Sequence, residues 1–194
     1  MSRQPDRVTF TLPEWLVEYA ECWRPSGLAE ERMRFVIGAS ERNVREKTGG
    51  PFAAAVFEHE SGAMVALGVN LVVSQQSSVL QAEMVALMLA QQRLHTYDLG
   101  VAGIPSHELV TSCEPCAMCL GAIPWSGVRY LVAGAAGADA GSIGFDEGVK
   151  PENWIREHES RGIRVQTGVC REDARAVLRL YRQTGGCIYN SKKS

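Results

Sequence analysis

The sequence has few of the features that mark membrane, nucleic-acid-binding or disulfide-stapled proteins. It has no run of about 18 apolar residues and no signal-peptide pattern, so we expect no transmembrane helix and no secretion. Positive charge is not in excess, because the formal net charge is −2, which argues against nucleic acid or an anionic membrane as partner. The chain has six cysteines, three clustered and three scattered, and this distribution does not suit a disulfide framework. We therefore expect a cytoplasmic protein.

The composition that is present is that of an ordinary globular protein. Hydrophobic residues make up 45% of the chain and charged residues 22%, which suffices for a sizeable core. At 194 residues we expect a single domain over 1–194. Within it, residues 1–47 form an N-terminal helical extension, and a glycine pair sets off a C-terminal tail at 185–194.

Hydrophobic periodicity and turn residues predict an alternation of helices and strands. Helices are expected at 13–19, 28–47, 80–94, 116–126, 151–161 and 171–183, and strands at 52–57, 64–73, 107–112, 128–135 and 163–167. Between them, the glycine-rich segment 134–148 is expected to be a loop. This order predicts an α/β protein, a three-layer α/β/α sandwich around a mixed five-stranded sheet.

Three thiols stand in a C-x-x-C-x-x-C run, where the apolar segment 108–110 gives way to a helix. They are Cys113, Cys116 and Cys119, and this spacing at a helix start indicates a metal site. A thioredoxin-like redox pair is an alternative, since it also follows a strand and opens a helix. A zinc ribbon needs a second C-x-x-C pair, and a ferredoxin-type cluster needs a fourth cysteine soon after, which makes both less favoured.

Zinc-dependent nucleobase deaminases combine an H-x-E segment with P-C-x-x-C. In that signature one histidine and two cysteines hold zinc, and the glutamate carries protons without binding the metal. Residues 115–119 match the second half. Ala82 and Glu83 match the end of the first half at a predicted helix start, while Gln81 stands at the histidine position.

The chain resembles the cytidine-deaminase-like superfamily and, within it, bacterial guanine deaminases. The matching segments are 50–54 with Asn70, then 82–83, 111–123, 144–147 and 188–190. They extend over most of the chain from residue 50 onward. The resemblance implies the cytidine-deaminase-like fold, a zinc cofactor, a small-molecule purine substrate and a homodimer.

The resemblance implies roles in metal binding and catalysis at five positions. Cys116 and Cys119 are expected to hold zinc, with Gln81 at the place of the third ligand. Glu83 is expected to carry protons from water to the purine ring and the leaving amine. Glu147 matches a second carboxylate near the leaving group, although without the resemblance it reads as a solvated loop residue.

Four further positions match residues that contact the purine. They are Phe52, Asn70, Trp125 and Tyr189, the last of which belongs to a tail that closes over the pocket, often that of the dimer partner. Read without the resemblance, Trp125 is a core residue and Asn70 a turn or bulge residue. Tyr189 on its own reads as part of a loose chain end.

Gln81 is the departure from the family pattern. An amide oxygen is a weaker zinc donor than an imidazole nitrogen, although both side chains are neutral. Loss of a ligand's hydrogen-bond partner alone costs ~10–100-fold in affinity, so we expect weaker zinc binding here. Three readings stay open: a weak ligand in a working deaminase, an impaired metal site in a purine-binding relative, or an introduced change in a normal enzyme.

The sequence therefore favours zinc-dependent hydrolysis of guanine or a related aminopurine to xanthine, or its analogue, and ammonia. The alternative is a catalytically impaired relative that binds purines. A tRNA adenosine deaminase, or another nucleobase or nucleoside deaminase, ranks lower, because the chain is slightly acidic and shows no basic face.

Overall fold

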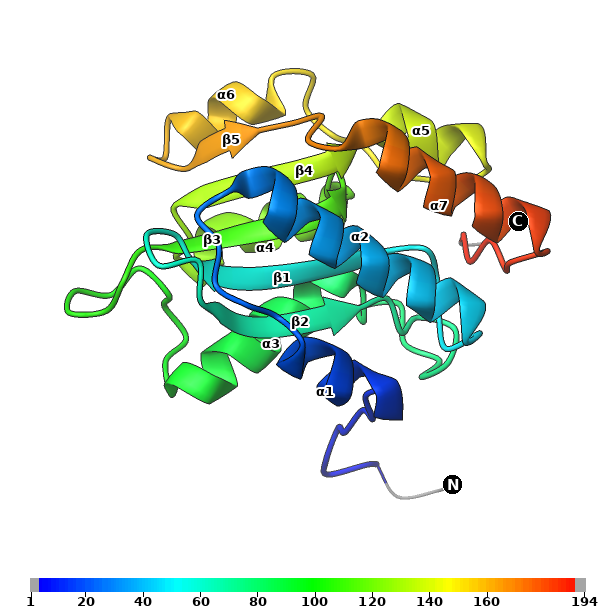
Figure 1. Ribbon diagram of the computed structural model, residues 1–194, viewed down its shortest axis with the longest axis horizontal. Helices are drawn as coiled ribbons and strands as arrows, with labels where there is room; N and C mark the ends of the chain where they lie inside the picture. Colours follow the sequence, from blue (N-terminus) through cyan, green and yellow to red (C-terminus); the bar gives the residue numbers. More distant parts are fainter. Residues whose placement is uncertain (1–3, 191–194) are drawn as a thin grey trace.

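Five strands form one mixed sheet in the computed structural model, which describes residues 4–190 (Figure 1). The strands are β1 (Ala53–Glu58), β2 (Met64–Val69), β3 (His107–Cys113), β4 (Tyr130–Ala135) and β5 (Arg164–Gln166). Their order is β2-β1-β3-β4-β5. β1 runs antiparallel to β2 and β3, and β3, β4 and β5 are parallel to one another. The predicted mixed five-stranded sheet is confirmed.

Helices cover both faces of this sheet (Figure 1). They are α1 (Glu14–Glu21), α2 (Ala29–Arg45), α3 (Ala82–Leu94), α4 (Ala117–Ser126), α5 (Gly137–Ser142), α6 (Trp154–Glu159) and α7 (Arg171–Gln183). α2 and α7 pack against each other on one face, while α3 and α4 contact each other on the opposite face. The three-layer α/β/α arrangement is thus confirmed.

The two faces of β1 belong to two separate hydrophobic cores. Ala53, Ala55 and Phe57 join the core beneath α2 and α7, whereas Ala54 and Val56 join the core beneath α3 and α4. Successive side chains of a strand point to opposite faces, so a strand covered on both sides needs an unbroken apolar run. The run at 53–57 meets that need and fixes β1 near the centre of the sheet.

The largest differences from the sequence prediction lie at the end of β2 and in the segment 134–148. The second strand ends at Val69 rather than at residue 73, and Asn70 is the first residue after it. The glycine-rich segment 134–148 contains the short helix α5, where a loop was predicted. α5 forms because the carboxylate of Asp139 accepts a hydrogen bond from the backbone N–H of Ala136 at 2.9 Å, which caps the first turn.

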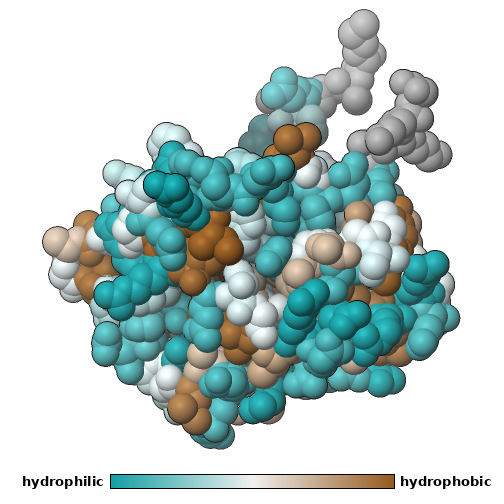
Figure 2. Space-filling model, turned by 90° about the horizontal axis from the view of Figure 1, so that it is seen from above, coloured by the Kyte–Doolittle hydropathy of each residue, from teal (hydrophilic) through white to brown (hydrophobic). Residues whose placement is uncertain are grey.

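The outer surface is mostly polar on the side that carries β5, α5 and α6. Figure 2 views the molecule from this side and shows hydrophilic residues over most of it, with hydrophobic residues in separate small patches. Within residues 4–190, every helix is too short or too polar to cross a bilayer.

Candidate active site

Two helix N-termini meet beside the end of β3. α3 begins at Ala82 and α4 at Ala117, so Glu83 lies in the first turn of one helix and the thiols lie at the start of the other. The Sγ atom of Cys119 is 3.5 Å from the Oε2 atom of Glu83 and 3.5 Å from the Sγ atom of Cys116. The fold thus brings together the two halves of the signature, which are more than thirty residues apart in the sequence.

Glu83 is held in a dry environment. Its side chain is buried, and this burial, with a smaller contribution from the nearby Cys116 sulfur, raises its pKa to about 7. The hydroxyl of Thr111 donates a hydrogen bond of 3.2 Å to its Oε1 atom and fixes the orientation of the carboxyl group. A carboxyl group with a pKa near neutrality can both accept and donate a proton.

The two thiols have different proton affinities. The contact with Cys119 lowers the pKa of Cys116 to about 6, and backbone amides at the start of α4 act in the same direction, against the effect of burial. The same contact, together with burial, raises the pKa of Cys119. The pair therefore carries a thiolate that is available to a metal ion.

Gln81, directly before α3, has its amide fixed by two neighbours. Its Oε1 atom accepts a hydrogen bond of 2.8 Å from the Nδ2 atom of Asn70, and its Nε2 atom donates to the carbonyl of Ser78 at 3.4 Å. A carbonyl oxygen has two lone pairs, so Oε1 retains one for a metal ion. Asn70 itself is fully buried and not part of a strand, which is why an asparagine is tolerated there.

The donor groups of the site can be tested against the zinc ion that the signature implies. Two thiolates that bind one tetrahedral zinc ion at ~2.3 Å lie about 3.8 Å apart, close to the 3.5 Å separation of Cys116 and Cys119. In the part of the chain that the structure describes, no three His, Cys, Asp or Glu side chains are grouped to hold a metal ion. The separation of the thiol pair therefore fits a zinc ion, and Gln81, which lines the same cavity as Cys116, offers a neutral oxygen there.

A cavity of about 260 Å³ opens over these groups. The predicted site residues that line it are Phe52, Gln81, Glu83, Cys116, Glu147 and Tyr189. Cys119 and Asn70 lie behind this lining and contact it through Glu83 and Gln81. The structure thus brings eight of the nine predicted site residues to one place.

Glu147 is part of the pocket wall, and so it is not a solvated loop residue. Its side chain is 17% exposed, and its backbone carbonyl accepts a hydrogen bond of 2.9 Å from the N–H of Ala117 at the start of α4. Burial raises the pKa of Glu147 to about 7, against the opposing effect of the ammonium group of Lys150. A second carboxyl group with a near-neutral pKa therefore faces the cavity.

The C-terminal tail closes over the pocket of its own chain. The hydroxyl of Tyr189 accepts a hydrogen bond of 2.8 Å from the Nδ2 atom of Asn70, and its ring packs 5.0 Å from the ring of Phe145. The side chain of Asn190 accepts from the N–H of Asp146 at 2.9 Å. Burial raises the pKa of Tyr189, so its hydroxyl keeps a proton that it can donate into the pocket.

Trp125 is the one predicted site residue that the structure does not bring to this pocket. It is 87% exposed at the end of α4 and lines a separate hollow with Trp154 and His158. The alternative reading of Trp125 as a core residue is wrong, because so large an exposed fraction excludes it from either core.

Sequence reasoning gave no role to several residues of the site. Thr111 and Phe145 lie within the matching segments, so the segments themselves could have indicated them. Asp146 and Asn190 also lie there and join the tail to the pocket wall. Lys150 lies outside every matching segment, and its only signal is the spacing of three residues from Glu147.

The chain is similar to proteins of known activity over most of its length. Residues 27–135 match the cytidine and deoxycytidylate deaminase zinc-binding region. The chain is 38% identical over 115 residues to the guanine deaminase of Bacillus subtilis, which covers 59% of this chain and 69% of that protein. It superposes on the guanine deaminase of Nitrosomonas europaea with a TM-score of 0.89 and 47% identity, over 94% of this chain and 100% of that one. A structure of NE0047 with 2,6-diaminopurine gives a TM-score of 0.90 and 49% identity, over 95% and 97% of the two chains.

Proposed function

The chain belongs to the family defined by the cytidine and deoxycytidylate deaminase zinc-binding region, and on this basis we propose that it is a guanine deaminase-like aminohydrolase. Its reaction is the hydrolysis of guanine or a related aminopurine to xanthine, or its analogue, and ammonia. The observation that carries the proposal is the position of Glu83, a buried carboxyl group with a pKa of about 7, 3.5 Å from the thiol pair. Relatives with 38% and 47% identity are guanine deaminases.

Each part of the pocket has a chemical task in this proposal. Cys116, Cys119 and Gln81 would hold a zinc ion, which would supply Lewis-acid activation of water. Glu83 takes one proton from the attacking water and passes it to the purine ring nitrogen. It then takes the second proton and delivers it to the amino group, which leaves as ammonia. Glu147 lines the same cavity and would assist the departure of the amino group.

The remaining contacts suit a free purine base. The cavity of about 260 Å³ lies below the ~300–1,000 Å³ of pockets for larger ligands, which favours a base over a nucleoside. Phe52 offers an aromatic surface in the lining. We propose that the hydroxyl of Tyr189, which lines the cavity, and the amide of Asn70, which donates to this hydroxyl from behind the lining, contact the polar edge of the purine.

Gln81 supports a second candidate function, a purine-binding relative with an impaired metal site. Its oxygen is already a hydrogen-bond acceptor for Asn70, and it is a neutral donor in a place where zinc favours nitrogen or sulfur. This candidate predicts guanine binding without turnover. The predicted homodimer and cytoplasmic location stay proposals, and sedimentation of the purified protein would show whether its mass is that of two chains.

Ammonia release and metal content, measured on the same preparation, test the proposal. Incubation with guanine should release ammonia and form xanthine, while guanosine, adenine, cytosine and tRNA should release little. Metal analysis should find zinc in the active preparation. Zinc-loaded protein that binds guanine but releases no ammonia from it would favour the second candidate, and release from tRNA alone would overturn both.

A further inference from the structure

Two of the chain segments that line the pocket supply Cys116 and Glu147, and a lysine of the second segment contacts the first. The first segment, 113–116, leads into α4 and carries the thiol Cys116; the second, 144–150, carries Glu147. The Nζ atom of Lys150 is 3.3 Å from the carbonyl oxygen of Pro115 and 3.8 Å from the Oε2 atom of Glu147. This ammonium group therefore contacts both segments.

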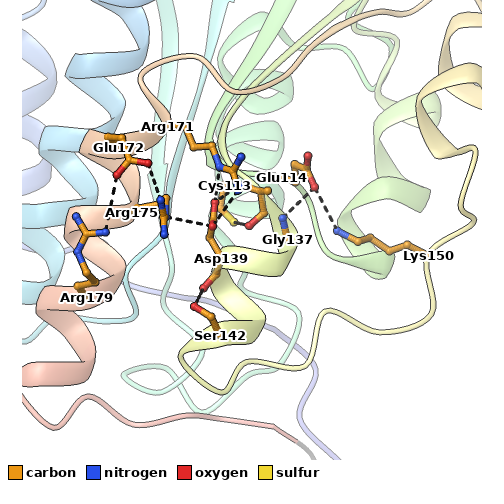
Figure 3. Close-up of polar contacts among 11 residues, drawn as sticks. Cys113, Glu114, Gly137, Asp139, Ser142, Lys150, Arg171, Glu172, Arg175 and Arg179 are labelled. Atoms are coloured by element: carbon orange, nitrogen blue, oxygen red, sulfur yellow. Dashed lines mark hydrogen bonds and ion pairs between the residues drawn. The ribbon is translucent and has the colours of Figure 1, made fainter.

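The surroundings of the ammonium group are closely packed. Its other neighbour is the Oε2 atom of Glu114, at 4.0 Å, which also accepts a hydrogen bond of 2.9 Å from the N–H of Gly137 (Figure 3). A methyl group at Gly137 would lie 2.5 Å from the Nζ atom of Lys150, so a larger residue there would displace this ammonium group. The side chain of Lys150 is 16% exposed, and the site confines it to this position.

The backbone of the second segment has anchors of its own, whereas the carboxylate of Glu147 does not. The backbone carbonyl of Glu147 is bound by the N–H of Ala117, and Asn190 holds the neighbouring backbone at Gly144 and Asp146. Among the described residues, the salt-bridge partner of the Glu147 carboxylate is Lys150. Loss of the ammonium group would thus leave the loop in place and free the carboxylate to rotate.

We propose that Lys150 is a positioning residue that aims the carboxylate of Glu147 at the leaving group. The inference rests on the proposed deaminase function and extends it. The attraction between Lys150 and Glu147 is stronger than at a surface, because both side chains are more than four-fifths buried and poorly screened by water. A displacement of about 1 Å in a catalytic group costs on the order of 100-fold in rate.

Three variants test this inference: Lys150→Gln, Lys150→Arg and, as a control, Lys47→Met. Gln keeps a donor for the Pro115 carbonyl and removes the charge, so kcat with guanine should fall on the order of 10–100-fold with little change in KM. Arg restores the charge and should recover most of kcat. Lys47 is an exposed lysine outside the pocket, and its variant should match the parent. Thermal unfolding should show all three within a few degrees of the parent.

The outcomes separate this inference from the proposed function. A parent protein that releases no ammonia from guanine would defeat the proposed function, and the inference with it. An active parent with an equally active Lys150→Gln variant would overturn the inference alone. If Lys150→Arg loses as much activity as Lys150→Gln and both unfold well below the parent, Lys150 is a packing residue, which also overturns it.

Discussion

Two clusters of charged residues lie on opposite sides of α5. They differ in the balance of cations and carboxylates and in the direction in which the carboxyl pKa values are shifted. The α7 cluster consists of Asp139, Arg171, Glu172, Arg175 and Arg179 (Figure 3). The pocket cluster consists of Glu83, Glu114, Glu147 and Lys150. In the α7 cluster cations outnumber carboxylates, and the hydrogen bond from Arg171 lowers the pKa of Asp139. In the pocket cluster carboxylates outnumber cations, and burial raises the pKa of Glu83 and Glu147 to about 7.

This difference separates groups that stabilise the fold from groups that are kept for chemistry. An exposed ion pair adds a little stability and has no reason to exchange protons at neutral pH. A buried carboxyl group that lacks hydrogen-bond or ion-pair partners destabilises the fold. Its pKa, however, is raised toward neutrality, which suits acid–base catalysis. Substitutions in the pocket cluster should therefore change activity more than stability, and substitutions in the α7 cluster should do the reverse.

The sharpest test of the comparison is Glu83→Gln, for which we expect the largest effect. The amide still accepts the hydrogen bond of Thr111 through its oxygen but cannot carry protons, so kcat with guanine should fall ~10²–10⁴-fold. Zinc content should stay the same, since Glu83 is not expected to be a ligand. The melting temperature should be unchanged or higher, because the substitution removes a buried ionisable group. Steady-state kinetics, metal analysis and thermal unfolding check the three statements. Turnover close to that of the parent would remove Glu83 as the proton carrier.

Gln81→His should have the next largest effect. It should change the affinity for zinc rather than proton transfer. An imidazole nitrogen is a better zinc donor than an amide oxygen, and the affinity for zinc should rise by about 10–100-fold. Competition with a chelator of known affinity measures this without reference to turnover. Gln92→His, on the exposed side of α3, is the matched control and should leave the affinity unchanged. If Gln81→His behaves like this control, Gln81 does not lie at the metal.

The sequence was sufficient for the parts of the site that depend on local spacing. Cys116, Cys119 and Glu83 each lie at the start of a helix, and both helix starts and the succession of helices and strands along the chain were predicted. The hydrophobic pattern predicted the sheet, because a strand such as 53–57 is apolar on both faces and must be covered on both. These features could be predicted since each rests on residues that are close together in the chain.

The parts that could not be predicted depend on distant residues. Asn70 is buried because Asn43 donates to its backbone carbonyl at 3.0 Å, a contact between residues 27 positions apart. The position of Lys150 depends on its contacts with Gly137 and with the segment before α4, which form only in the folded chain. Trp125 is exposed although it lies in an apolar helix, which no local pattern indicates. α5 was missed because its sequence is glycine-rich and because Asp139, which caps it, pairs with Arg171 of α7, 32 residues away in the chain.

Asp139 gives the smallest expected effect and tests the other side of the comparison. Asp139→Asn keeps an oxygen acceptor for the N–H of Ala136 and loses the charge that pairs with Arg171 and Arg175. At pH 7 we expect a melting temperature lower by about 2 °C or less, since the arginine side chains of the pairs are 48% and 39% exposed, and no change in kcat. Because folding lowers the pKa of Asp139, its stabilising effect is complete above the unfolded pKa of about 3.9 and is lost as the pH falls through the lower folded value.

The pH dependence and a second variant separate the charge of Asp139 from its capping role. The difference in melting temperature between parent and Asp139→Asn should be constant from pH 7 to about pH 5 and shrink below about pH 4, where the parent's carboxylate also becomes neutral. Asp139→Ala removes the cap as well and should cost about 1 kcal/mol more, or roughly 2–4 °C, at every pH. If Asp139→Asn instead lowers kcat while the melting temperature holds, α5 transmits the charge of the α7 cluster to Glu114 and Lys150. The two clusters would then act as one, and the division between stabilising and chemical groups would fail.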